Sequence, residues 1–273
     1  MRGKFLDMFN NSVSRIFGMR RTSNEETVTS NLESPYKKDY DDPILDYYET
    51  PIGNYILPNN APRDIIINSM KLGKIFEPEI VNAAKQHIKE GTVVLDVGAN
   101  LGQMAILFSR LVGPEGSIYA FEADDYIYNI LDLNIKANNI ANIKPICKAV
   151  YNKTGNTMLY PVQDFKKFDS YGSYGLDPNA NEGRKVETIT IDSLNIQEPI
   201  SFMKVDVQGS DLFVLEGAME TIKRNKMPIL FEYEEQFNEL FQTTWEDYSG
   251  FIESISYRIA MTIYDINYLI VPK

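Results

Sequence analysis

Cysteine and histidine each occur only once in this chain of 273 residues. Because Cys147 has no second cysteine to pair with, no internal disulfide can form, and a reducing compartment such as the cytoplasm is predicted. The sequence also contains no His/Cys cluster of the kind that binds zinc. His87 falls in a predicted helix before the first buried strand, so we expect an ordinary surface residue and not a catalytic base.

Long apolar runs and positive charge are scarce as well. No stretch approaches the roughly 20 apolar residues of a membrane helix, and Asp7 stands where a cleaved signal peptide has its apolar core. The net charge is −11, and residues 1–24 hold five Lys/Arg against one Asp, so the remaining body carries −15. Such a body repels a phosphate backbone, and nucleic acid is not expected as a partner.

The N-terminal residues 1–42 differ in composition from the rest. Phe5, Phe9, Val13, Ile16 and Phe17 are three or four positions apart or adjacent, which predicts an amphipathic helix. This helix can dock on the body, on a second copy in a homodimer, or on an anionic membrane surface, and the first two are favoured. A polar linker follows, and residues 43–273 are expected to form one folded domain.

Helical and strand patterns alternate through this domain. The predicted strands are 53–58, 92–97, 117–123, 143–150, 201–207, 228–234, 257–265 and 267–273, and the predicted helices are 77–91, 101–113, 124–139, 210–225 and 243–255. Alternation of this kind predicts an α/β fold in which helices cover both faces of a parallel sheet, closed here by an antiparallel hairpin.

The loop after the strand 92–97, in the stretch "VVLDVGANLGQ", lies where doubly wound sheets bind cofactors. A dinucleotide motif needs a second glycine where this loop has Asn100, and Asp96 would face an anionic pyrophosphate. S-adenosylmethionine carries an ammonium and a sulfonium, and a carboxylate at the strand end suits the ammonium. Charge therefore favours the methyl donor. Glu122, at the end of the next strand, can bind the ribose hydroxyls of either cofactor.

Six motifs in this order resemble the FkbM family of S-adenosylmethionine-dependent methyltransferases: "LDVGANLGQMAILFS", "AFEAD", "KAV", "TITIDSL", "FMKVDVQGSDLFVLEGA" and "PILFEYE". The resemblance runs from about Ile52 to the C-terminus. It implies a Rossmann-like class I methyltransferase fold, a seven-stranded sheet with an antiparallel last strand, and methyl transfer, often to a hydroxyl of a sugar or secondary metabolite. "KVDVQGSD" departs from the common D-x-E-G-x-E form, since Gln208 replaces a glutamate, which argues against a metal or acid–base role there.

The resemblance also implies a set of cofactor-binding residues. The loop around the methionine part is formed by Asp96, Gly98, Ala99, Asn100 and Gly102, the ribose carboxylate is Glu122, the adenine slot is lined by Ala123 and Ala149, and the pair before the first core strand is Phe76 and Glu77.

Methyl transfer to a hydroxyl needs an aligned acceptor and a group that takes its proton. The candidates at strand ends are Asp206, Lys204 and Glu232. Asp206, which also lies beside the cofactor, is the first choice for the base, with a helix cap as the competing interpretation. Lys204 shares its face of the strand and can be its ion-pair partner. No metal is assigned, although a Mg²⁺ site at Asp206 stays open.

The segment 164–185 is long, rich in tyrosine and glycine, and placed to cover the crevice. Tyr171 and Tyr174 can stack on a sugar, and Ser173 offers a hydroxyl. The family resemblance, and not the spacing of these residues, implies a sugar acceptor, so an O-methyltransferase of a sugar or sugar nucleotide is predicted. N-methylation of a small molecule, a cofactor-binding scaffold without transfer activity and, less well supported, a nicotinamide oxidoreductase remain the alternatives.

Overall fold

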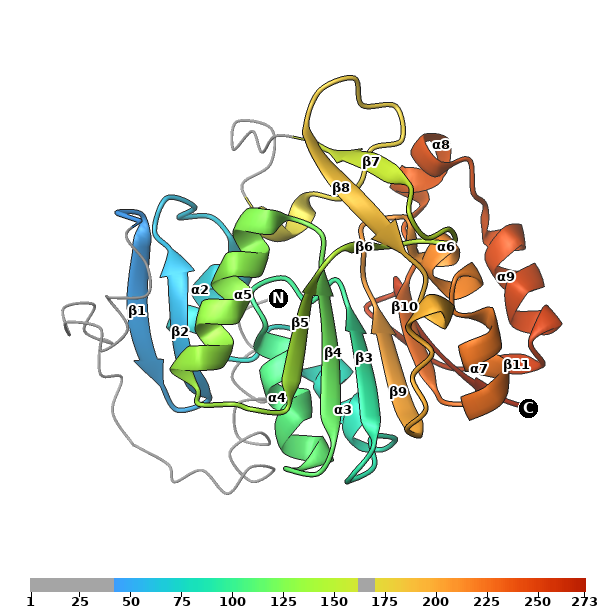
Figure 1. Cartoon of the computed structure of the whole chain (residues 1–273), viewed down its shortest axis with the longest axis horizontal. Helices are drawn as coiled ribbons and strands as arrows, with labels where there is room; N and C mark the ends of the chain where they lie inside the picture. The colour runs from blue at the N-terminus through green and yellow to red at the C-terminus, as the bar shows by residue number, and fades with distance from the viewer. Residues whose placement is uncertain (1–41, 162–169) are drawn as a thin grey trace.

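The computed structural model describes residues 42–161 and 170–273, so the predicted N-terminal helix and most of the linker lie outside it. A seven-stranded sheet in the order β11-β12-β10-β9-β3-β4-β5 forms the centre (Figure 1). Its strands are β3 (Val93–Val97), β4 (Ser117–Glu122), β5 (Ile143–Cys147), β9 (Ile200–Val205), β10 (Ile229–Glu232), β11 (Tyr257–Ile263) and β12 (Asn267–Pro272).

The pairing of these strands confirms the expected α/β sheet. β3 lies between β4 and β9 and is parallel to both, and β9 is parallel to β10. β12, the last strand of the chain, is antiparallel to both of its neighbours, β10 and β11. The carboxyl ends of β3, β4, β9 and β10 therefore meet at one edge of the sheet, where a ligand is expected.

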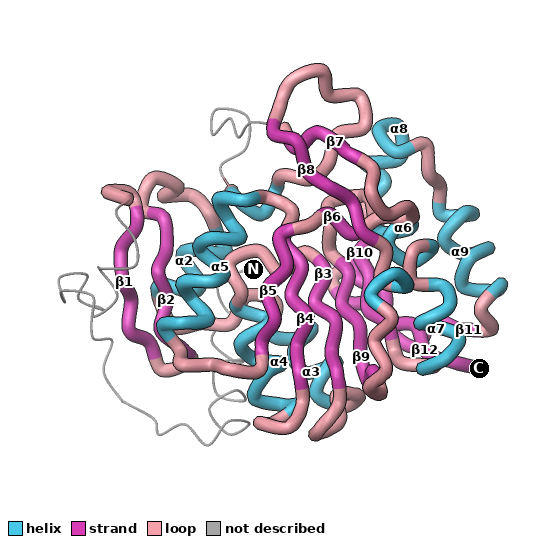
Figure 2. The backbone as a smooth tube through the Cα atoms, in the orientation of Figure 1, coloured by secondary structure: helices cyan, strands magenta, loops and turns pink. Residues whose placement is uncertain are grey.

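Helices cover both faces of the sheet (Figures 1 and 2). Val94 belongs to the core on one face, whereas Val93, Leu95 and Val97 belong to the core on the other, as the twofold alternation of a strand requires. The first core contains α3 (Pro78–Lys85), α4 (Gln103–Val112) and α5 (Asp125–Ala137), and the second contains α6 (Asp211–Glu216), α7 (Met219–Asn225) and α9 (Trp245–Ser254). None of the described helices is long and apolar enough to cross a membrane.

Several elements differ from the sequence prediction. The strand at 53–58 is present as β2 (Gly53–Pro58), but it pairs with an unpredicted β1 (Leu45–Thr50) and is followed by an unpredicted α2 (Ile65–Lys71). The predicted strand 143–150 divides into β5 and β6 (Ala149–Val150), and β6 joins β7 (Thr157–Tyr160) and β8 (Arg184–Ile189) in a separate sheet. α8 (Asn238–Phe241) is a further short helix that was not predicted.

Two predicted helices are shorter than their patterns. The helix expected over 210–225 breaks between α6 and α7, because Gly217 packs against the Tyr151 carbonyl and accepts a hydrogen bond from Asp192 N. The helix expected to reach Gly91 ends at Lys85. Gln86 N and His87 N donate to carbonyls three residues earlier, which tightens the turn, and Lys89 N donates to Ser201 Oγ.

Candidate active site

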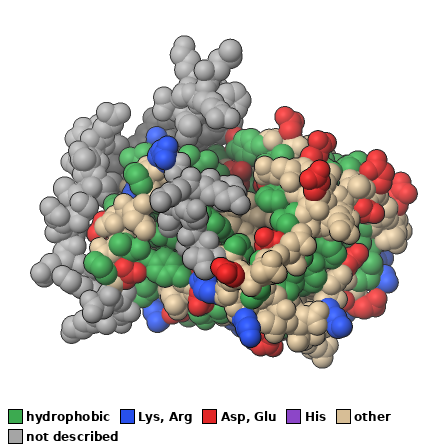
Figure 3. All heavy atoms as spheres, turned by 90° about the horizontal axis from the view of Figure 1, so that it is seen from above, with side chains coloured by type: hydrophobic (Ala, Val, Ile, Leu, Met, Phe, Trp, Pro, Cys, Tyr) green, Lys and Arg blue, Asp and Glu red, His purple; other side chains and the backbone are tan. Residues whose placement is uncertain are grey.

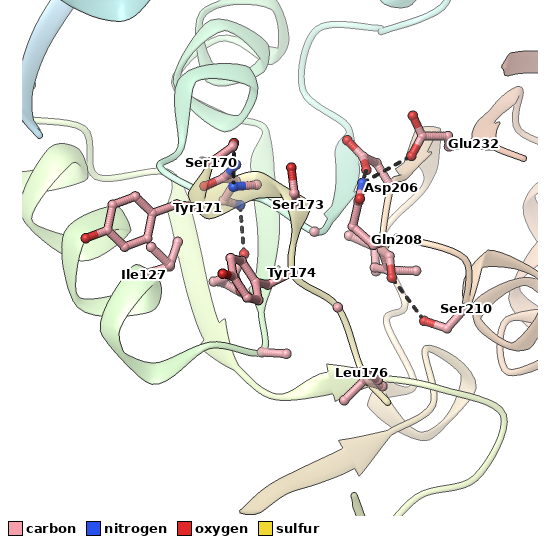
Figure 4. A pocket seen from close by; sticks show the side chains of 18 of the residues that line it. Ile127, Ser170, Tyr171, Ser173, Tyr174, Leu176, Asp206, Gln208, Ser210 and Glu232 are labelled. Carbon is pink, nitrogen blue, oxygen red and sulfur yellow. Dashed lines mark hydrogen bonds between the residues drawn. The ribbon is translucent and has the colours of Figure 1, made fainter. Parts of the chain in front are cut away.

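A cavity of about 750 Å³ opens at the carboxyl ends of the strands. Val97, Glu122 and Glu232 line it from the ends of β3, β4 and β10, and Asp206 lines it from the position after β9. The segment Tyr171–Ser173 lies across from them (Figure 4). The volume lies within the range of pockets that enclose a cofactor or drug-sized ligand.

The loop between β3 and α4 makes its turn with three residues at positive φ: Gly98 (77°), Asn100 (49°) and Gly102 (89°). A Cβ on Gly98 would lie 1.8 Å from the Asp206 carbonyl oxygen, so only glycine fits there. Asn100 adopts the left-handed conformation that asparagine tolerates better than most residues. Its amide oxygen is buried and has no hydrogen-bond partner among the described residues, which leaves it available to a ligand.

Glu122 holds this loop from the end of β4. Its carboxylate accepts hydrogen bonds from Asn100 N and Asp124 N, each at 2.9 Å. Burial raises the pKa of Glu122 to about 7. The side chain therefore ties the loop after β3 to the residues after β4, and it lines the cavity between them.

Phe76 and Glu77 reach the cavity from the start of α3. Gln103, the first residue of α4, braces the pair, because its side chain accepts from Phe76 N at 2.8 Å and donates to the Lys74 carbonyl at 2.9 Å. Burial and the charge of Asp206 raise the pKa of Glu77 to about 7. Gln103 directly follows the glycine loop. Its side chain bonds to residues almost 30 positions earlier in the chain, so this role was not predicted from the sequence.

Lys204 connects two aspartates behind the cavity wall. Its ammonium lies 3.2 Å from Asp206 Oδ2 and 3.7 Å from Asp96 Oδ1, and it is almost fully buried. Although burial lowers it, the carboxylates of Asp206 and Asp96 raise the pKa of Lys204 above its usual value, so the side chain stays protonated. Lys204 thus acts as an ion-pair partner in this geometry. The Asp96 carboxylate faces Lys204 and does not line the cavity.

Gln208 bridges the two carboxyl groups of the opposite wall (Figure 4). Its amide nitrogen donates to Asp206 Oδ1 at 3.2 Å and to Glu232 Oε2 at 3.3 Å. Burial and the charges of Asp206 and Asp211 raise the pKa of Glu232 well above its usual range, which keeps it protonated at neutral pH. Asp206 is consequently the accessible carboxylate of this wall, since its side chain is 30% exposed. The bridge explains why an amide can replace the carboxylate expected at position 208.

The segment 170–176 packs over the crevice and is anchored by polar contacts. Tyr171 N donates to Asp64 Oδ2 and the Tyr171 hydroxyl donates to Asn60 Oδ1, both at 2.9 Å. The Tyr160 hydroxyl donates to the Tyr174 carbonyl at 2.6 Å. Both tyrosines at 171 and 174 are largely buried, so their rings form part of the wall.

The structure brings most of the sequence-derived residues to this one cavity. Those that line it are Phe76, Glu77, Gly98, Asn100, Glu122, Ala123, Ala149, Tyr171, Ser173, Tyr174, Asp206 and Glu232. Asp96, Ala99, Gly102 and Lys204 are not among the lining residues. Lining residues that were not predicted include Ile65 and Ile66 of α2, Tyr160 of β7 and Leu240 of α8. Among the described residues, no group of three or more His, Cys, Asp or Glu side chains is arranged to hold a metal ion.

The buried carboxyls make stability depend on pH. The pKa of Glu122 is raised to about 7 and that of Asp211 to about 8, from unfolded values near 4. Their folded state binds protons more tightly, so this contribution to stability is complete below about pH 4 and is lost as pH rises through 7 to 8. For Glu122 alone the span is roughly 3 kcal/mol. We expect the melting temperature of the ligand-free protein to fall by several degrees between pH 5.5 and 8.5, roughly 2–4 °C per kcal/mol.

Thermal melts across this range measure the effect. The Glu122→Gln variant, which cannot titrate at this position, should show a shallower decline. A melting temperature that rises with pH, or an unchanged slope in the variant, contradicts the assignment.

Comparison with known proteins gives one family match. The model of the methyltransferase FkbM domain matches residues 96–259, more than half of the chain. A demethylmenaquinone methyltransferase of Geobacillus kaustophilus (strain HTA426) is 28% identical over 80 residues, or 29% of this chain and 31% of that protein. The match thus spans about a third of that curated relative.

Solved structures are similar at low sequence identity. Methyltransferase FkbM from Methylobacillus flagellatus KT is 17% identical with a TM-score of 0.44, covering 75% of this chain and 52% of that one. A SAM-dependent methyltransferase from Aquifex aeolicus is 17% identical with a TM-score of 0.40, covering 71% and 88%.

Proposed function

The chain belongs to the FkbM methyltransferase family, and from this premise we propose that the whole protein transfers a methyl group from S-adenosylmethionine to a hydroxyl of a sugar or sugar nucleotide. The matched region carries an S-adenosylmethionine-dependent methyltransferase domain. One observation supports a hydroxyl acceptor in particular. The Asp206 carboxylate is presented to the cavity by Lys204 and Gln208, in the position of a group that takes a proton.

The residues at the ends of β3 and β4 fit the methyl donor. Glu122 lines the cavity at the end of β4, where a carboxylate can bind the ribose hydroxyls, and Asn100 Oδ1 is a buried acceptor with no partner among the described residues. Ala123 and Ala149 give a small apolar lining suited to adenine. When bound, S-adenosylmethionine supplies an electrophilic methyl group on a positively charged sulfur.

The opposite wall orients the acceptor. Asp206 would accept a hydrogen bond from the acceptor hydroxyl and take its proton, while S-adenosylmethionine, held by Glu122 and Asn100, would supply the methyl group and leave as S-adenosylhomocysteine. Lys204 donates a hydrogen bond to one oxygen of Asp206 and Gln208 donates to the other, so the two side chains hold the carboxylate in one orientation. The segment 170–176 lines the crevice across from Asp206 and Glu232 (Figure 4).

Two measurements test this function. Calorimetry with S-adenosylhomocysteine is expected to show binding to the purified protein, and absence of binding at millimolar concentration contradicts the cofactor site. Mass spectrometry of cell-surface glycans and sugar nucleotides, from cells with and without the protein, is expected to show one species lighter by the mass of one CH₂ group in its absence. Cofactor binding without any methylated product would instead favour a scaffold.

A further inference from the structure

The acceptor end of the cavity is acidic. Asp206, Glu232 and Glu234 line it after β9 and β10, and Glu77 reaches it from α3, close enough for the charge of Asp206 to act on it. In the space-filling view, acidic side chains also gather on the side of α8 and α9 (Figure 3). Glu232 is protonated in this geometry, so an anionic ligand that enters here meets the carboxylates of Asp206 and Glu234 in particular.

The basic side chains at and behind the cavity wall already have acidic partners. Within residues 42–161 and 170–273, Lys148 is the one basic side chain that lines the cavity, and it is paired with Glu187. Lys204 is buried behind the wall, where its single positive charge is shared between Asp206 and Asp96. No arginine of these ranges lines the cavity, so the bidentate contact that typically recognises phosphate is missing there.

The segment 162–169 lies outside the described residues. It contains Lys166 and Lys167 but also Asp164 and Asp169, and its net charge is zero.

The remaining groups of the acceptor end suit an uncharged, hydroxylated ligand. Gln208, Gln236 and Ser210 offer neutral hydrogen-bonding groups, while Phe237 and Leu240 offer apolar surface. Gly209, at φ 93°, lies so close to Phe237 that a Cβ would stand 2.4 Å from its side chain, so only glycine leaves room for the ring. A sugar presents both a ring face for apolar contact and hydroxyl groups for these amides.

We propose that the unit methylated by this protein carries no phosphate, sulfate or carboxylate, and is a neutral sugar or polyol, free or within a glycan, rather than a sugar phosphate or a nucleotide-linked sugar. This inference rests on the proposed function, and it selects between the two acceptors named there. Discrimination against anionic acceptors arises from repulsion by Asp206 and Glu234, which we call the acidic wall, as much as from attraction to the neutral groups.

Radiolabelled methyl transfer tests the inference. The full chain is incubated with methyl-labelled S-adenosylmethionine and a small-molecule and glycan extract of its source cells, and labelled products are separated from the donor and passed over an anion exchanger at neutral pH. The labelled product is expected in the flow-through. A labelled product that is retained, and is released by phosphatase or pyrophosphatase, overturns the inference while supporting the methyl transfer itself. Absence of any labelled product contradicts the proposed function.

A matched pair of charge reversals tests the physical cause. Glu234 lines the cavity, whereas its neighbour Glu235 is exposed and does not. We expect a hexose 1-phosphate to inhibit labelled transfer by Glu234→Lys at several-fold lower concentration than by the wild type or by Glu235→Lys. The role of the acidic wall is overturned if the hexose 1-phosphate inhibits all three proteins equally. It is also overturned if this phosphate inhibits the wild type competitively and more strongly than the neutral hexose does.

Discussion

Replacing Asp206 with asparagine is expected to slow methyl transfer by about 10²- to 10⁴-fold, the usual contribution of a positioned acid–base group. Asparagine keeps the shape of the side chain but cannot take the acceptor's proton. The affinity for S-adenosylhomocysteine should stay within a few fold, because Glu122 and Asn100 remain unchanged at the other end of the cavity. Single-turnover rates and calorimetry on the same variant measure the two quantities.

Asp265→Asn is the matched control, since Asp265 is exposed in the β11–β12 turn and does not line the cavity. It should turn over at the wild-type rate. Asp206→Asn turnover within a few fold of wild type would reject Asp206 as the proton acceptor. The competing interpretation of Asp206 as a helix cap is wrong, because the N-cap of α6 is Ser210 and Asp206 lies four residues earlier, with its carboxylate on Lys204 and Gln208.

Local sequence patterns were sufficient for the parts of the fold that depend on neighbouring residues. The apolar run at β3, the glycines at 98 and 102 and the final hairpin all carry their own periodicity or turn chemistry, and each is found at the expected place. β6 lacked such a signal, because only two of its residues pair and their partner, β8, lies almost 40 positions later. Pairings of this kind depend on tertiary packing, which one sequence does not display.

The candidate site also contains residues that the sequence identified and contacts that only the structure shows. The sequence identified Asp206 and Glu232 as strand-end carboxylates, and the parallel register of β9 and β10 brings these ends together. It could not show that Gln208 spans them, because this requires a left-handed backbone at position 208 and the fixed distance between the two strands. Nor could it show that Asp96 faces inward to Lys204, since that contact joins residues more than 100 positions apart.

Replacing Glu122 with alanine is expected to weaken S-adenosylhomocysteine binding by about 10²-fold or more. Two charge-assisted hydrogen bonds to the ribose would be lost, each worth roughly 1.5–3 kcal/mol, and 1.4 kcal/mol corresponds to tenfold in affinity. The same change removes the acceptor of Asn100 N and Asp124 N, which loosens the loop that holds the rest of the cofactor. Both effects lower affinity, so the loss should exceed that of a side chain that only touches the ligand.

Two further variants separate the ribose contact from a general loss of structure. Glu115→Ala removes an exposed glutamate before the start of β4, at the opposite end of the strand from the cavity, and should bind S-adenosylhomocysteine like the wild type. Glu122→Gln keeps one carbonyl oxygen but turns an NH₂ group toward a backbone N–H, so an intermediate loss is expected. Calorimetry, with a thermal melt to verify cooperative unfolding, ranks the three proteins. If Glu122→Ala binds as tightly as Glu115→Ala, the carboxylate only ties the loop to β4, and the ribose must be held by another group of the cavity.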